Sequence, residues 1–330
     1  MKLLDMRNLK TTFHIDAGQV QAVRGITFHV NKGESIGIVG ESGSGKSVSM
    51  LSLMRLLPDS ARVEAEQMTF DGIDLLHVNT KQMRKLLGNE IGMIFQDPMT
   101  SLNPLFTIGQ QIIEPIRIHQ KLSKAEARKK AIEVLKLVEI PSPESRLDQY
   151  PHEFSGGMRQ RVMIAMAISC NPKLLIADEP TTALDVTIQA QILDLMRDLK
   201  KKFDTSIVLI THDLGVVASM CNRIAVMYGG QIVEEGTTRE IFYSPQHPYT
   251  WGLIRSMPKI TEGEKKKLIP IPGSPPDLLS PPKGCSFAAR CEHAMKICTQ
   301  LSPVPVSLTE SHRAACWLMH PKAAKAANAN

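Results

Sequence analysis

The sequence lacks two features that would place a chain in or across a membrane. None of its apolar runs is long enough to span a bilayer, and its N-terminus shows no signal peptide. It also lacks a concentrated basic patch, because the lysines and arginines behind its net charge of +6 are scattered. We therefore expect a soluble, cytoplasmic protein that does not bind nucleic acid, while docking onto a membrane protein stays open.

Length and composition allow a fully packed protein. The 330 residues are enough for one large α/β domain with an appendage, or for two domains. A hydrophobic content of 43% supports a complete core. An α/β protein with room for a second domain is therefore expected.

A glycine-rich loop follows the first apolar strand pattern. Residues 40–47 read GESGSGKS and match the pattern G-x-x-x-x-G-K-[ST], with a buried strand predicted over 35–39 and a helix over 48–57. Glycines let backbone N–H groups turn towards phosphate oxygens, and the helix N-terminus adds a positive dipole end. Lys46 suits the β- and γ-phosphates of a nucleotide, and the Ser47 hydroxyl suits Mg²⁺. The predicted nucleotide contacts are Ser42, Gly43, Ser44, Gly45, Lys46 and Ser47.

An acidic pair ends another buried strand. Residues 173–179 form an apolar run that closes with Asp178 and Glu179. Ligand chemistry in open α/β sheets collects at the carboxyl ends of strands. Asp178 is predicted to hold Mg²⁺, and Glu179 to polarise an attacking water. A helix-capping acidic pair is the alternative.

Two further strand ends carry polar side chains. Gln96 follows the strand predicted over 91–95, where its amide suits Mg²⁺ or a water. His212 follows the strand predicted over 206–210, where it suits a γ-phosphate. Taken alone, each is more often structural.

A second anion site is indicated by Ser155, Gly156 and Gly157, which open a predicted helix with a serine in the capping position. A plain helix N-cap is the alternative.

Phe13 lies between the first strands, where it suits either stacking on adenine or a place in the core.

The chain divides by pattern. Residues 1–35 read as antiparallel strands, residues 97–160 as a helical insertion, and a hairpin around Gly229 and Gly230 closes the α/β domain. Twelve of the 21 prolines lie from Pro245 onward. We expect a domain over 1–245 and an extension over 246–330 that contains a proline-rich, semi-rigid linker.

Four cysteines cluster in that extension: Cys285, Cys291, Cys298 and Cys316. Such a cluster favours a metal site over disulfides in a cytosolic chain. Four thiolates can hold zinc or an iron–sulfur cluster, but zinc sites favour C-x₂₋₄-C spacings, none of which occurs here, and the wider spacing suits a larger cluster. Zinc and free or disulfide-bonded thiols stay open.

Taken together and in order, these motifs resemble those of the ATP-binding cassette (ABC) ATPases. The resemblance implies a P-loop NTPase fold with a RecA-like core, an antiparallel β subdomain and a helical subdomain, and it implies ATP and Mg²⁺ as ligands. It makes Phe13 the adenine-stacking aromatic, Gln96 the Q-loop glutamine and His212 the switch histidine. Residues 155–160, SGGMRQ, resemble the family signature LSGGQ, with Phe154 and Met158 departing from it. In the family this signature closes over ATP held by a partner ATPase in a head-to-tail dimer.

Residues 95–104 and 245–253, with the cysteines, resemble the D-type ATPase subunits of bacterial dipeptide and oligopeptide importers. This implies peptide uptake driven by ATP hydrolysis, a [4Fe–4S] cluster and a place at the cytoplasmic face of the membrane. The implied partners are a sister ATPase, two permease subunits and, indirectly, a substrate-binding protein. Nickel and glutathione importers share these features. A soluble ABC ATPase acting on nucleic acid and an iron–sulfur regulatory protein are the rival readings.

Overall fold

The computed structural model describes residues 1–182, 184–257 and 270–320, and these divide into two compact units. The first unit comprises Met1–Leu3, Val30–Ser35 and Phe70–Ile210. The second comprises Leu4–His29, Ile36–Thr69 and the chain from Thr211 onward. Residues 258–269 and 321–330, which belong to the predicted extension, lie outside the described residues.

The first unit is built on three parallel strands whose residues are almost all buried. The strand β8 (Leu174–Asp178) pairs with β7 (Ile91–Ile94) on one side and β9 (Ser206–Thr211) on the other. A central parallel strand is covered on both faces, which explains the continuous apolar runs in the sequence. The carboxyl ends of β7 and β8 therefore lie side by side, directly before Gln96 and Glu179.

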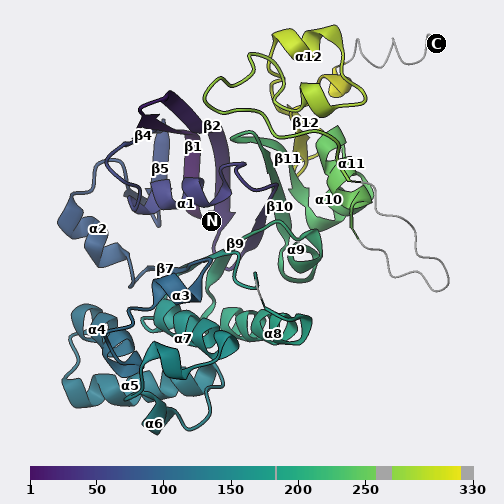
Figure 1. Cartoon of the computed structure of the whole chain (residues 1–330). Helices are drawn as coiled ribbons and strands as arrows, with labels where there is room; N and C mark the ends of the chain where they lie inside the picture. Colours follow the sequence, from purple (N-terminus) through teal and green to yellow (C-terminus); the bar gives the residue numbers. More distant parts are fainter. Residues whose placement is uncertain (183, 258–269, 321–330) are drawn as a thin grey trace, which may run out of the picture. The chain divides into compact units, whose positions relative to one another are not determined.

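Helices of the first unit lie mostly between β7 and β8 in the chain, as predicted for the insertion (Figure 1). Ser123 and Glu126 form a capping box at the start of α5, and Pro143 begins the short helix α6. The helices and the short strand of this unit are β6 (Ile73–Asp74), α2 (Thr80–Leu86), α3 (Pro98–Ser101), α4 (Ile108–Gln120), α5 (Lys124–Leu137), α6 (Pro143–Arg146), η1 (Pro151–Glu153), α7 (Gly156–Ile168) and α8 (Val186–Phe203).

The second unit contains the predicted antiparallel strands. The long strands β1 (Lys2–Ile15) and β2 (Gly18–Asn31) are neighbours, and β4 (Ala61–Glu64) and β5 (Gln67–Phe70) both lie beside β1. The strand β3 (Ser35–Val39) belongs to a separate sheet of this unit and leads into helix α1 (Lys46–Met54). That helix begins at Lys46 rather than at residue 48, because Gly45 takes the N-cap position with a left-handed φ of 96°.

The C-terminal part of the second unit adds strands to the sheet of β3. The strand β10 (Arg223–Tyr228) is parallel to β3 and forms the predicted hairpin with β11 (Gln231–Thr237). Two short strands that the sequence did not predict, β12 (Val306–Ser307) and β13 (Arg313–Ala314), extend this sheet beyond β11. The helices here are α9 (Leu214–Met220), α10 (Thr238–Tyr243), α11 (Pro248–Arg255), η2 (Ala288–Arg290), α12 (Lys296–Gln300) and η3 (Trp317–Met319).

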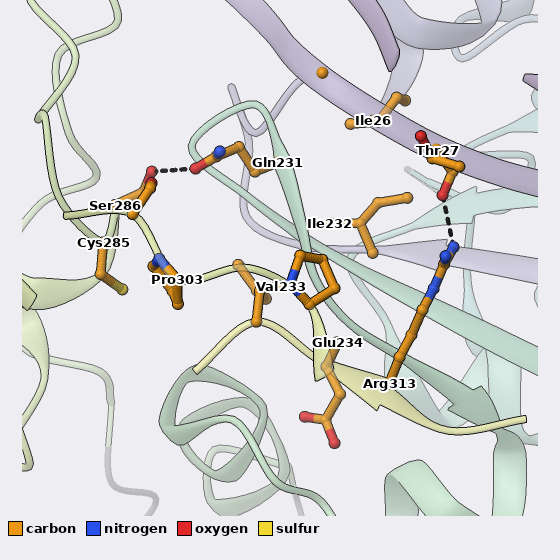
Figure 2. Close-up of a pocket in the computed structure, with 14 residues that line it drawn as sticks. Ile26, Thr27, Gln231, Ile232, Val233, Glu234, Cys285, Ser286, Pro303 and Arg313 are labelled. Carbon is orange, nitrogen blue, oxygen red and sulfur yellow. Dashed lines mark hydrogen bonds between the residues drawn. The ribbon is translucent and has the colours of Figure 1, made fainter. Parts of the chain in front are cut away.

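We call residues 248–257 and 270–320 the C-terminal segment. It packs on the hairpin through two polar pairs: His312 Nε2 lies 2.7 Å from Glu234 Oε1 in a buried pair, and Arg313 Nε donates to Glu235 over 2.8 Å in a partly buried one. A cavity of about 240 Å³ remains where the segment meets β2 and β11 (Figure 2). At its wall, Ser286 Oγ donates to Gln231 Oε1 over 2.9 Å. The cavity therefore lies along the surface on which the C-terminal segment packs.

Candidate active site

The glycine loop lies in the second unit between β3 and α1. A Cβ on Gly40 would lie 2.1 Å from the Met227 carbonyl oxygen, and one on Gly45 would lie 2.4 Å from the Ala22 carbonyl oxygen. Gly43 differs, because its φ is +76° and a Cβ there would have no atom within 4 Å. Gly40 and Gly45 thus serve the packing of the loop itself, whereas Gly43 borders open space.

Two side chains of this loop, those of Lys46 and Ser44, indicate that it binds an anionic ligand. Lys46 is buried, and its Nζ donates to the Gly40 carbonyl over 2.8 Å and to the Glu41 carbonyl over 2.9 Å. The Ser44 hydroxyl is buried and has no hydrogen-bond partner among the described residues. An unpaired buried hydroxyl is unfavourable, and a bound phosphate oxygen would supply its partner. The loop therefore fits a nucleotide phosphate on its own geometry.

The acidic strand end lies in the first unit. Asp178 is the last residue of β8, is buried, and pairs in register with Ile210 of β9. Glu179 follows with a left-handed φ of 47°, a conformation that is uncommon for a residue with a side chain. Its backbone N–H donates to the Ile210 carbonyl over 2.8 Å, which holds it at the sheet edge.

The structure brings Gln96 and Glu179 together. Gln96 Nε2 donates to Glu179 Oε2 over 3.2 Å, and Thr182 Oγ1 donates to the same oxygen over 2.8 Å. Sequence reasoning gave Thr182 no role, although its place three residues after the acidic pair is the available signal. The carboxylate is thus oriented by two donors while it stays only half-buried.

The serine-glycine stretch also lies in the first unit. Ser155 is the N-cap of α7, as predicted, and its Oγ accepts from the Met158 N–H over 3.4 Å. A Cβ on Gly156 would meet no atom within 4 Å, whereas one on Gly157 would lie 3.2 Å from Ile188. The helix start is therefore open at Gly156, with N–H groups that have no helical acceptor.

Two residues beside this stretch, Phe154 and Gln160, are buried. Phe154 is buried, and the Arg146 guanidinium lies 5.6 Å from its ring centre. Gln160 is buried in α7, and its Nε2 donates to the Pro180 carbonyl over 2.6 Å. Gln160 thus ties the start of α7 to the loop that carries Glu179.

The remaining predicted residues lie in the second unit. Phe13 is half-buried on β1, where it pairs with Ala61 of β4. His212 follows β9 and is exposed. Ser42 is exposed in the glycine loop, and Ser47 is half-buried in the first turn of α1.

The predicted metal cluster is wrong. Cys285, Cys291, Cys298 and Cys316 do line one small cavity, yet the described residues contain no group of three or more His, Cys, Asp or Glu that could hold a metal ion. Burial raises the pKa of the Cys285 and Cys291 thiols, and that of Cys316 to about 12. Metals bind the thiolate, which burial disfavours.

Hydrogen bonds connect the parts of the chain around these cysteines. The Cys285 N–H donates to the Cys298 carbonyl over 2.8 Å, and the Trp317 indole donates to the Leu301 carbonyl over 2.9 Å.

None of the helices in the described part of the chain is both long enough and apolar enough to span a membrane.

Comparison with known proteins gives consistent similarities. A family model described as "ABC transporter" matches residues 23–182, and one described as "Oligopeptide/dipeptide transporter, C-terminal region" matches residues 233–298. The chain is 57% identical to the oligopeptide transport ATP-binding protein OppD of Bacillus subtilis, over 98% of this chain and 91% of that protein. It is 53% identical to the dipeptide transport ATP-binding protein DppD of Bacillus subtilis, over 98% of this chain and 96% of that protein.

A solved structure shares the ATP-binding cassette fold. It is the dimeric structure of a post-hydrolysis state of an ATP-binding cassette bound to ADP and Pi. The TM-score is 0.64 at 28% identity, over 72% of this chain and 99% of that chain. The predicted ABC ATPase fold is thereby confirmed.

Proposed function

The chain belongs to the ABC transporter family of ATP-binding proteins that serve oligopeptide and dipeptide transport, and on this premise we propose that it hydrolyses ATP to power peptide import into a bacterial cell. The observation that carries the proposal is the glycine loop, with the buried Lys46 ammonium, the unpaired Ser44 hydroxyl and the open space at Gly43. These three features together support a ligand with several anionic oxygens.

We assign the triphosphate to the loop residues Ser42 to Ser47. The Lys46 ammonium, which donates to two loop carbonyls, would exchange these acceptors for β- and γ-phosphate oxygens. The aromatic ring of Phe13 on β1 is proposed to stack on the adenine, and the half-exposed ring leaves a face for that contact.

Glu179 is the proposed general base for hydrolysis. The carboxylate stands at a strand end, oriented by Gln96 and Thr182, and accepts a proton from the water that attacks the γ-phosphate. The oxygens of Ser47, Gln96 and Asp178 are the hard donors that Mg²⁺ prefers, and the ion would neutralise phosphate charge. His212 is proposed to contact the γ-phosphate and to report its loss.

The open helix start at Gly156 supports a second half of the site. We propose that Ser155, Gly156 and Gly157 close over ATP held by a sister ABC ATPase in a head-to-tail dimer, which two permease subunits carry at the cytoplasmic face of the membrane. A substrate-binding protein delivers the peptide to those permeases. We further propose that residues 1–245 form the nucleotide-binding domain, with its helical subdomain over residues 97–160, and that residues 246–330 form an extension.

Replacing the proposed base tests the function. Glu179→Gln keeps the shape and the acceptor oxygen of the side chain but removes its basicity, so ATP turnover should fall by about 10²–10⁴-fold while ATP binding persists. Phosphate release measures turnover, and a fluorescent ATP analogue measures binding.

The matched control is Glu90→Gln, which removes a carboxylate that pairs with Lys173 before β7 begins. The control should turn over ATP at the wild-type rate. Wild-type turnover by Glu179→Gln would remove Glu179 from the proposed role.

A further inference from the structure

One residue of the glycine loop, Glu41, is held by the C-terminal segment at two points. Its backbone N–H donates to the Tyr249 hydroxyl over 2.9 Å, across 208 positions of the chain. Its carboxylate accepts from Arg290 Nη1 over 2.7 Å and from Nη2 over 3.1 Å, across 249 positions. A two-pronged guanidinium–carboxylate pair fixes direction as well as distance. The C-terminal segment therefore fixes the position of Glu41 in the glycine loop.

Arg290 is itself immobilised. Its Nε donates to the Pro272 carbonyl over 2.8 Å, Nη2 to the Ile271 carbonyl over 3.2 Å, and Nη1 to the Tyr228 hydroxyl over 3.1 Å. With the two bonds to Glu41, five hydrogen bonds engage the side chain, and a guanidinium has five N–H groups. The side chain is only 6% exposed. The position of the Arg290 side chain therefore determines that of the Glu41 carboxylate, because the contacts of Arg290 already fix it in place.

Tyr249 is equally fixed. It is fully buried, and its ring centre lies 4.5 Å from that of Tyr228 and 5.3 Å from that of Phe287. The Arg290 guanidinium lies 5.7 Å from the Tyr228 ring centre, so the cation and the aromatic rings form one packed group. This packing fixes the position of the Tyr249 hydroxyl, whose oxygen accepts the hydrogen bond from the Glu41 N–H.

Glu41 also contacts Lys46, the lysine of the glycine loop. The Glu41 carbonyl accepts from Lys46 Nζ over 2.9 Å, so one residue is held by the C-terminal segment and holds the ammonium in turn. Arg290 also balances the Glu41 carboxylate, which would otherwise stand as an unpaired anion in a loop that takes a polyanion. Burial opposes the guanidinium charge, but the bonds to Glu41 and Tyr228 outweigh it and raise the pKa of Arg290.

We propose that Arg290 and Tyr249 are positioning residues for ATP: they hold Glu41, and through it the phosphate loop, in the form that receives the triphosphate. The proposal rests on the function proposed above and adds that nucleotide affinity depends on the C-terminal segment. Neither residue needs to touch the nucleotide.

The test is the affinity of the purified full-length chain for a fluorescent ATP analogue with Mg²⁺. Arg290→Gln frees the loop and leaves the Glu41 carboxylate unpaired, so the Kd should rise about tenfold. Adding Glu41→Gln removes the unpaired anion and should recover part of the lost affinity. In steady-state turnover, the KM for ATP should rise with little change in kcat, as expected for lost ground-state binding.

Arg24→Gln is the matched control. Arg24 also anchors the C-terminal segment, by donating to Ser286 Oγ over 2.9 Å and to the Pro282 carbonyl over 3.2 Å. Within the described residues, none of the hydrogen bonds of its side chain reaches the glycine loop. Its Kd should stay within twofold of the wild-type value. Thermal unfolding of each variant confirms that it is folded.

Three outcomes would overturn the proposal. Wild-type affinity in Arg290→Gln would do so, as would an equal loss in Arg24→Gln, because the segment would then act only through general stability. A wild-type chain that binds no ATP would overturn the proposed function as well. Tyr249→Phe supplies a second variant: it removes one hydroxyl from a packed ring and should raise the Kd severalfold.

Discussion

Alanine substitutions at Gly43 and Gly45 test whether the two glycines have different roles. We expect Gly43 to leave room for a ligand and Gly45 to be needed for the packing of the loop itself. An alanine forced into the left-handed region costs about 1–2 kcal/mol of folding free energy. Gly43 has a φ of +76° and open space around a new Cβ, so Gly43→Ala should cost only that amount. Gly45 has a φ of +96° and a carbonyl oxygen 2.4 Å from the new Cβ. Displacing that backbone adds about 1–3 kcal/mol, so Gly45→Ala should cost about 2–5 kcal/mol.

Gly72→Ala is the control, because Gly72 has a φ of +82° and equally open surroundings in the turn before β6. Urea unfolding should rank Gly43→Ala with Gly72→Ala and place Gly45→Ala well below both. Binding of a fluorescent ATP analogue should separate the first two. Gly43→Ala should lose at least about tenfold in affinity, equivalent to about 1.4 kcal/mol, since its methyl group fills the space assigned to a phosphate. Equal affinity in Gly43→Ala and Gly72→Ala would refute the reasoning.

Two further variants test other parts of the account. Gly156→Ala places a better helix former at an open position, so the free energy of unfolding should stay the same or rise slightly. ATP-dependent dimerisation with the sister ATPase, measured by size-exclusion chromatography, should weaken. Unchanged dimerisation would exclude Gly156 from the partner's site. Desolvation opposes the Glu240 carboxylate, but bonds from Thr309, Thr237 and Ser311 outweigh it and lower its pKa from 4.5 to about 2. Glu240 therefore adds stability above pH 4.5 that disappears as the pH falls through about 2. The gap in unfolding temperature between the wild type and Glu240→Gln should close over that range, and a gap that is constant with pH would contradict the assignment.

Features encoded locally could be predicted from the sequence. The loop of residues 40–47, the Ser155 cap and the hairpin at Gly229 each depend on neighbours a few positions away. The pairing of Gln96 with Glu179 was within reach too, because both follow strands and adjacent parallel strands end at one edge. Even here the first helical residue was misplaced, since the left-handed N-cap at Gly45 is a backbone property.

Contacts between distant parts of the chain could not be predicted. Nothing in the sequence pairs Glu41 with a residue 249 positions away, and the proline-rich region before Arg290 looked like a linker. The buried partners of Arg313 and His312 were hidden for the same reason. Such pairs form only when the sheet of β11 and β13 is assembled.

The cysteines show where a spacing argument fails. Their proximity in the chain predicted a metal site, which is wrong, although the four cysteines do line one small cavity. A metal site also needs ionised thiols that converge on a point, and burial raises the pKa of the Cys316 thiol to about 12. Spacing carries no information about that local environment.

The most direct test of the central claim is uptake of a labelled peptide into vesicles that contain the two permeases, the sister ATPase, this chain and enclosed ATP, with the binding protein and the peptide outside. The wild-type chain should support accumulation that stops without ATP, and the Glu179→Gln chain should support almost none. Accumulation at the wild-type rate with Glu179→Gln, or without ATP, would contradict the account.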